Sequence, residues 1–136
     1  MAKNWQNAPP PSLADFEAMA QDAWGRVPAE FRALASDLVI RIEDFPPDEI
    51  LADLGIDDPF DLTGLYQGVS LTQKSVMDGG RDPDMVFLYR RPILDEWAAG
   101  EDELGHLVAH VLIHEVGHHF GFSDDDMDAL AAEASA

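Results

Sequence analysis

The sequence predicts an α+β fold in which a small sheet packs on helices. Apolar residues recur at helical spacing near both ends of the chain, β-branched and aromatic runs occupy the middle, and glycine and proline separate these segments. Helices, then strands, then helices are the order expected of an α+β protein. The chain has 136 residues, 46% of them apolar, and no internal repeat, so we expect one domain.

The N-terminal part is expected to begin as a tail and continue as two helices. Residues 1–11 are polar and end in three prolines, so we expect a flexible tail there and a single domain over 12–136. Ser12 is placed to cap a first helix over about 13–24. A second, short helix is expected over 28–35.

Three runs of β-branched and aromatic residues are candidate strands, namely 38–42, 65–71 and 85–90. Residues 47–54 favour one or two helical turns, and the next residues, 55–63, read as a loop.

The C-terminal part is dominated by one long helix, expected over about 102–120 with Gly121 as its C-cap. A short helix around 93–98 precedes it. Ser123, with an acidic residue three positions later, predicts the start of a final helix that runs to about Glu133.

Charge and cysteine content exclude several classes of function. Twenty-seven acidic residues against eight basic ones give a formal net charge of −19. This excess argues against nucleic-acid and anionic-membrane partners, and it favours either basic partners or simple solubility. Cysteine is absent, which excludes disulfides and thiolate metal sites. The N-terminus has no apolar signal segment, so we expect a cytoplasmic protein. We also expect a monomer.

The long helix carries a pattern with chemical meaning. His114 and His118 are one helical turn apart and therefore lie on the same side, where two imidazoles can bind one Zn²⁺. Glu115 lies beside the pair, too far displaced to be a third ligand but well placed to take a proton from a metal-bound water. The H-E-x-x-H pattern therefore predicts a zinc site with Glu115 as the catalytic general base.

A third zinc ligand is expected just after the helix. Catalytic zinc commonly has three protein ligands and one open position. Gly121 lets the chain turn sharply, and Asp124 follows three residues later, so we expect Asp124 to be that ligand. Alternatively Asp124 caps the next helix, and Asp125 and Asp126 are equally acidic neighbours. Glu133 is a poorer candidate, because little chain separates it from the motif.

Three other histidines on this helix have simpler explanations. His106 and His110 continue the stripe of His114, and we expect them to be partly buried or to support the ligands. His110 and His114 could also bind a metal as a pair, but no glutamate lies between them. His119 is expected in the core. Gly117 costs helix stability, which close approach of another element would explain.

The sequence resembles the small bacterial zincin-like metallopeptidases in three stretches. These are Gly64-Leu-Tyr-Gln-Gly68, Val86-Phe-Leu-Tyr-Arg-Arg-Pro92 and His114-Glu-Val-Gly-His-His-Phe-Gly-Phe-Ser-Asp124, and the resemblance covers about residues 12–133. It implies a minimal zincin-like fold, with a small mixed sheet packed on helices and the H-E-x-x-H helix at the active site. It also implies Zn²⁺ held by a set of three ligands, His114, His118 and Asp124.

Within that resemblance the chain differs from metzincins. The third ligand position holds Asp rather than His, and Met127 lies too close to Asp124 to form the methionine turn of those enzymes. We expect Met127 in the core.

We therefore expect a zinc metallopeptidase that acts on peptide or protein substrates. Glu115 would take a proton from the water that attacks the peptide carbonyl and pass it to the leaving amine. An extended substrate would pair with a strand edge supplied by 65–71 or 84–90. Candidates for stabilising the oxyanion are Tyr66, Tyr89, Arg90 and Arg91.

Other interpretations stay open at this point. The domain could bind zinc without catalysis and act as a protein-interaction module, although such a site has no use for Glu115. It could hydrolyse a non-peptide amide. Two histidines and one carboxylate also suit Fe(II), and the H-E-x-x-H helix favours zinc.

Overall fold

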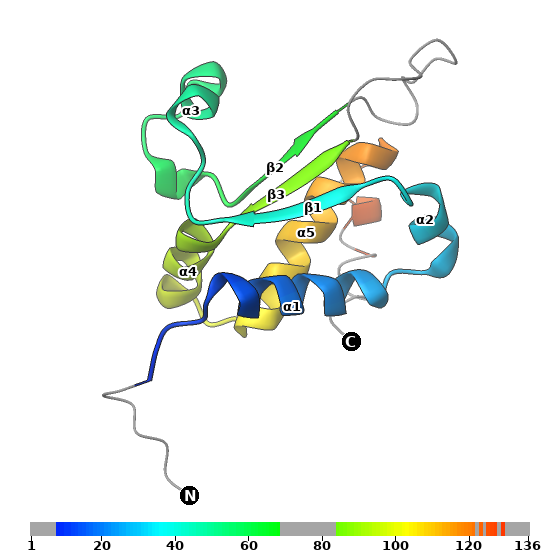
Figure 1. Ribbon diagram of the computed structural model, residues 1–136, viewed down its shortest axis with the longest axis horizontal. Coiled ribbons are helices and arrows are strands. Elements are labelled where there is room, and N and C mark those ends of the chain that lie inside the picture. The colour runs from blue at the N-terminus through cyan, green and yellow to red at the C-terminus, as the bar shows by residue number, and fades with distance from the viewer. Residues whose placement is uncertain (1–7, 69–83, 122, 124, 128, 130–136) are drawn as a thin grey trace, which may run out of the picture.

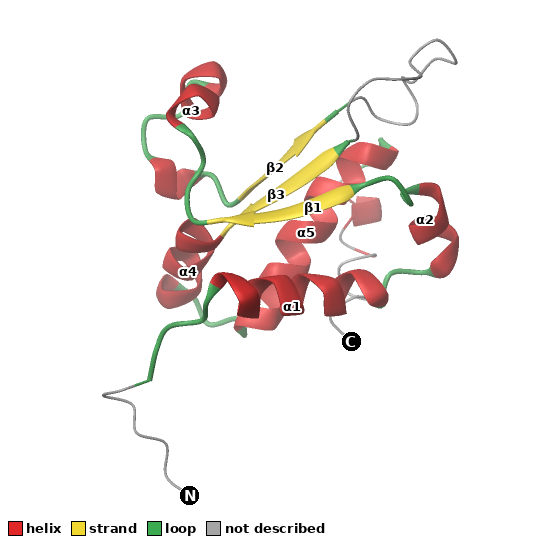
Figure 2. Ribbon diagram, viewed as in Figure 1, coloured by secondary structure: helices red, strands yellow, loops and turns green. Residues whose placement is uncertain are grey.

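The computed structural model describes residues 8–68 and 84–121, together with 123, 125–127 and 129. Figures 1 and 2 show the arrangement of its helices and strands. In chain order the elements are α1 (Leu13–Gly25), α2 (Ala29–Leu34), β1 (Val39–Glu43), α3 (Asp48–Leu54), the 3₁₀ helix η1 (Pro59–Asp61), β2 (Gly64–Gln67), β3 (Met85–Tyr89), α4 (Arg90–Ala99) and α5 (Leu104–Phe120).

The three strands form one mixed sheet in the order β1-β3-β2. β1 runs parallel to β3, with Val39 opposite Met85, and β2 runs antiparallel to it, with Tyr66 opposite Val86. The expected α+β class with a small mixed sheet is confirmed. Because β3 is central, the prediction that 84–90 supplies an open edge is wrong, and β2 is the edge strand on the side of α5.

The core lies between the sheet and the two long helices, α1 and α5, which Figure 1 shows on the same side of the sheet. Val86 and Leu88 of β3 are fully buried there. They meet Phe16 of α1 together with Val108 and Leu112 of α5, all of them with 0% exposure. Each such side chain stabilises the fold by about 1.5–3 kcal/mol through its removal from water. α5 is thereby fixed against the sheet along its apolar side.

The ends of the two long helices follow the chemistry of their sequences. The Ser12 hydroxyl accepts a hydrogen bond from the backbone N–H of Asp15 at 3.1 Å, and the Asp15 carboxylate accepts one from the N–H of Ser12 at 2.8 Å. This capping box confirms the expected start of α1. Gly121 adopts φ 72° and ends α5 as predicted.

Some boundaries differ from those predicted. α4 begins at Arg90 directly after β3, and Pro92 occupies its first turn, where a missing N–H costs little. α5 begins at Leu104 rather than about 102. Within the stretch expected to be loop, 55–63, the chain forms η1, which Asp58 caps by accepting a hydrogen bond from the N–H of Phe60 at 3.0 Å. The later part of the expected strand 65–71 and the end of the final helix lie outside the described residues.

None of the helices within the described part of the chain is long and apolar enough to cross a bilayer.

Candidate metal centre and catalytic helix

α5 presents its apolar side to the core, and three of its histidines, His106, His110 and His118, are exposed. Val111, Leu112 and Val116 are buried, while His114 and Glu115 lie at the boundary and His118 is exposed. The H-E-x-x-H residues are therefore carried by a helix whose orientation the core sets, and they lie at the rim where α5 meets β2.

Gly64 of β2 allows α5 to approach the edge strand closely. A Cβ on Gly64 would lie 2.8 Å from Cγ1 of Val111 and 3.1 Å from Cγ of Glu115. Gly64 pairs with Leu88 of β3, so its missing side chain would point to the same face as that buried leucine, toward α5. Glycine is thus required here by contact between the strand and the helix rather than by a turn.

Close approach places the Glu115 carboxylate between a strand and a histidine. It accepts a hydrogen bond from the backbone N–H of Tyr66, and its Oε1 lies 3.5 Å from Nδ1 of His118. Its side chain is 17% exposed. Burial raises the pKa of Glu115 above its ordinary value, although the charges of His118 and His114 and the Tyr66 N–H oppose this shift. A partly buried carboxylate with a raised pKa is suited to accept a proton.

The two motif histidines offer imidazoles at the same rim. The His118 side chain is 54% exposed, and the ring of Tyr66 packs edge-on against it, with centroids 6.3 Å apart. Since Nδ1 of His118 faces Glu115, Nε2 on the far side of the ring is the nitrogen that could bind a metal. The His114 ring lies against that of His110, with centroids 4.2 Å apart.

These donors fit zinc in chemistry and in spacing. Two imidazoles one helical turn apart, flanked by a glutamate that a strand N–H holds in place, supply two of the three protein ligands that a catalytic zinc site uses. Among the residues that the structure describes, no group of three or more His, Asp or Glu side chains is arranged to hold a metal. Asp124, the expected third ligand, lies outside the described residues.

Met127 connects the chain beyond α5 to the motif itself. Its side chain is 3% exposed, and a Cβ on Gly117 would overlap its Sδ and Cγ atoms. This contact confirms both the core position expected for Met127 and the close approach expected at Gly117. Met127 thus packs against the turn of α5 between His114 and His118.

The remaining histidines differ in part from expectation. His106 and His110 are both exposed rather than partly buried, because the apolar side of α5 turns them outward. Nε2 of His106 lies 3.6 Å from Oε2 of Glu103. His110 does contact His114. The side chain of His119 is not among those described.

Of the candidates for the oxyanion, Tyr66 is the one whose ring lies against His118. Arg90 donates from Nε to the carbonyl of Pro11 at 2.6 Å and pairs with Asp44 at 2.8 Å. The Arg91 guanidinium lies over the ring of Phe45, 5.4 Å from its centroid. Both arginines are therefore engaged at the end of the sheet away from His118.

Tyr89 is 1% exposed and so cannot meet a substrate. Burial raises the pKa of Tyr89 to about 12, and the charges of Glu43 and Glu115 add to the shift. The phenol therefore keeps its proton at neutral pH.

Asp84 belongs to this neighbourhood, and sequence reasoning did not find it. It is 1% exposed, and its Oδ2 accepts a hydrogen bond from the Tyr66 hydroxyl at 3.0 Å. Gly68, at φ 153°, leaves room for the same carboxylate, which a Cβ there would overlap. The sequence does show an acidic residue, Asp84, directly before a strand. Nothing in it indicates that Asp84 contacts Tyr66, which lies 18 positions earlier.

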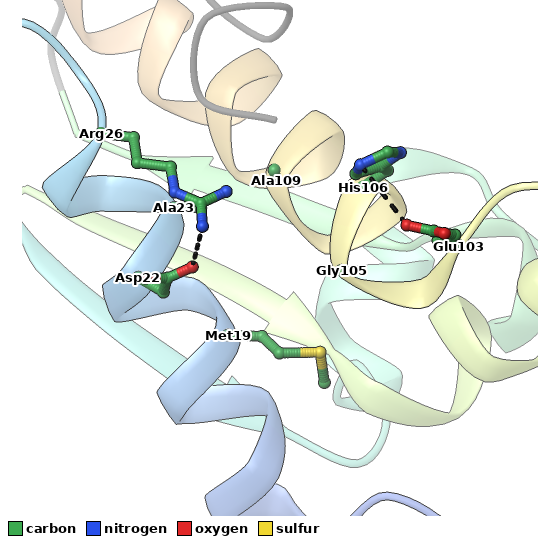
Figure 3. Close-up of a pocket in the computed structure, with 8 residues that line it drawn as sticks. All are labelled: Met19, Asp22, Ala23, Arg26, Glu103, Gly105, His106 and Ala109. Atoms are coloured by element: carbon green, nitrogen blue, oxygen red, sulfur yellow. Dashed lines mark ion pairs between the residues drawn. The ribbon is translucent and has the colours of Figure 1, made fainter. Parts of the chain in front are cut away.

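A separate hollow of about 240 Å³ lies between α1 and the start of α5 (Figure 3). It is lined by Met19, Asp22, Ala23, Arg26, Glu103, Gly105, His106 and Ala109. None of the H-E-x-x-H residues lines it, so this hollow is distinct from the rim that carries His114, Glu115 and His118.

Comparison with known families agrees with this geometry. The family model for zincin-like metallopeptidases matches residues 35–134, a span that includes the whole sheet and all of α5. No curated protein matches the chain. Because the match covers well over half of the sequence, the chain belongs to the zincin-like metallopeptidase family.

Proposed function

We propose that the protein is a zinc-dependent peptidase in which His114, His118 and Asp124 bind the metal and Glu115 is the general base. The observation that carries the proposal is the environment of Glu115, a partly buried carboxylate held by a strand N–H beside two histidines one turn apart. Family membership supports zinc-dependent peptide hydrolysis in general. A purely structural zinc site would have no use for a base in this position.

The residues of the chain divide the work of the reaction. Zinc, when bound, supplies Lewis-acid polarisation of the peptide carbonyl and of the attacking water. Glu115 takes the proton from that water and returns it to the leaving amine, and its raised pKa suits both transfers. The Tyr66 N–H fixes the carboxylate, and the Tyr66 ring restrains His118. Such positioning keeps the reacting groups in line without reorganisation.

An extended peptide is the substrate form that this rim favours. β2 is an edge strand, and the carbonyl of Thr63 accepts from the N–H of Tyr89, so alternate residues of β2 turn their backbone groups away from β3. A substrate chain could add to that edge beside Glu115. We further propose that the protein is cytoplasmic and acts as a monomer. Its charge of −19 disfavours self-association, and it also disfavours binding to nucleic acid or anionic membranes.

The test is hydrolysis of a quenched-fluorescence peptide library by zinc-loaded protein. Glu115→Gln should lower kcat by about 10²–10⁴-fold, because it removes the general base. Zinc affinity, measured by titration calorimetry, should persist in the same variant. The matched control is Glu103→Gln at the start of the same helix, where the side chain is 82% exposed.

Cleavage that Glu115→Gln and Glu103→Gln leave equally intact would refute the role of Glu115. Tight zinc binding with no hydrolysis of any peptide would instead favour a zinc-binding interaction module or action on another amide.

A further inference from the structure

Acidic residues concentrate in the connection between β1 and β2. Residues 43–61 contain eight of the chain's 27 acidic residues and no Lys or Arg, and seven of the eight are exposed. In Figure 1, α3 of this segment stands at the end of the sheet opposite α2. We call residues 43–61 the acidic–aromatic surface.

Apolar side chains are exposed within the same segment. Phe45 and Phe60 are each 36% exposed, and their rings meet edge to face with centroids 5.2 Å apart. Leu54, at the end of α3, is 49% exposed. Phe45 follows β1 and Phe60 precedes β2, so the aromatic pair closes the segment at its base. Aromatic side chains left in water among carboxylates form a surface with both apolar and electrostatic binding capacity.

The aromatic pair already shows the contact that a partner could extend. The guanidinium of Arg91 lies over the Phe45 ring, and the guanidinium of Arg90 pairs with Asp44. Arginine is therefore accommodated here both by a ring face and by a carboxylate. These two intramolecular contacts leave most of the exposed carboxylates of the segment to the solvent side.

We propose that the acidic–aromatic surface docks a basic polypeptide segment that carries arginine beside apolar side chains. Arginines would pair with the carboxylates of α3, and apolar side chains would cover Phe60 and Leu54. A second copy of this chain is disfavoured by its own net charge of −19, and nucleic acid or an anionic membrane by the same repulsion. The proposal concerns residues other than His114, Glu115 and His118, and it does not depend on catalysis.

The test is fluorescence anisotropy with a labelled synthetic peptide that has Arg on one helical face and Leu on the other. The measurement uses Glu115→Gln protein, so that the peptide is not cleaved. Glu49→Gln, Asp53→Asn and Asp57→Asn together should weaken binding about tenfold, since each exposed ion pair changes affinity by roughly twofold. The matched control neutralises three exposed acids on α1, α2 and the loop before β1, namely Glu17→Gln, Glu30→Gln and Asp37→Asn.

The apolar contribution is measured separately. A second peptide with Ser in place of Leu keeps the charge and should bind at least about fivefold more weakly. Phe60→Ala should remove most of that difference between the peptides, whereas Phe60→Leu should retain it. A melting curve for each variant shows that it is folded.

Three results would overturn the proposal. The first is that the control triple variant weakens peptide binding as much as the test variant does, which would show that binding depends only on net charge. The second is equal affinity for the Leu and Ser peptides. The third is absence of binding to the unneutralised surface at low salt, where electrostatic attraction is strongest.

Discussion

Replacement of Gly117 by alanine probes the contact between Met127 and the turn of α5 that carries His114 and His118. Alanine in mid-helix is ordinarily favoured over glycine by about 1 kcal/mol. Here its Cβ would overlap Sδ and Cγ of Met127, which is buried. Overpacking of this kind costs about 1–3 kcal/mol. The difference predicts that Gly117→Ala changes the free energy of unfolding by about 0–2 kcal/mol in the destabilising direction.

Removal of Met127 should reverse the sign of this effect. Met127→Ala alone should destabilise the protein by about 2 kcal/mol or more, because it empties a buried site. In that background the new Cβ has room, so Gly117→Ala should stabilise by up to about 1 kcal/mol. The coupling between the two positions is then about 1–3 kcal/mol, measured by urea unfolding of the four proteins of a double-mutant cycle.

Gly105 supplies the internal control, because it lies on the same helix and nothing comes within 4 Å of a Cβ placed there. Gly105→Ala should be neutral or stabilising in both backgrounds. If Gly117→Ala stabilises the wild-type chain as Gly105→Ala does, Met127 does not pack on the motif. The contact between Met127 and Gly117 would then be refuted.

Three further predictions concern the rim around Glu115. Gly64→Ala should lower kcat/KM by at least about tenfold with little loss of zinc affinity. The new Cβ would lie 2.8 Å from Val111 and 3.1 Å from Glu115, and it would push β2 away from α5. Unchanged kinetics would contradict the close approach of strand and helix. In zinc-free protein the raised pKa of Glu115 means that the folded state holds this proton more tightly, so stability falls as pH rises from the ordinary value of 4.5 through the folded pKa. Glu115→Gln should flatten that part of a pH series of urea unfolding curves, and a slope that persists unchanged would assign it to other groups. Absorbance titration of tyrosine should show a step near pH 12 that is lost in Tyr89→Phe, because burial raises the pKa of Tyr89 to about 12. The raised pKa lowers stability as the pH rises from 10 to that value. A step of unchanged size near pH 12 in the variant would refute the assignment.

The parts of the fold that depend on local sequence were predictable. The Ser12 cap of α1, the Gly121 end of α5 and the strand at 85–90 follow from side-chain chemistry and periodicity within a few residues. α4 begins at Arg90, before the stretch expected around 93–98, because Pro92 favours the first turn of a helix without fixing which position of that turn it occupies. Periodicity also cannot order strands in space, which is why β3 was a candidate edge although it is central.

The candidate site shows the same division. The spacing of His114, Glu115 and His118 could be read directly, since one helix carries all three. Contacts that join distant segments could not, and they include the Tyr66 N–H at Glu115 and the Tyr66–Asp84 hydrogen bond. His106 and His110 are exposed, although partial burial was one expectation for them. Histidine occurs both inside proteins and on their surfaces, so its spacing along a helix does not show which way it faces. The packing of α5 decides that.

The most direct test of the central claim is a crystal structure of the zinc-loaded protein, with the metal located by anomalous scattering at the zinc edge. We expect one strong peak bound by His114, His118 and Asp124, with a water that contacts the Glu115 carboxylate. A peak shared by His110 and His114, or a zinc closed by four protein ligands, would contradict it.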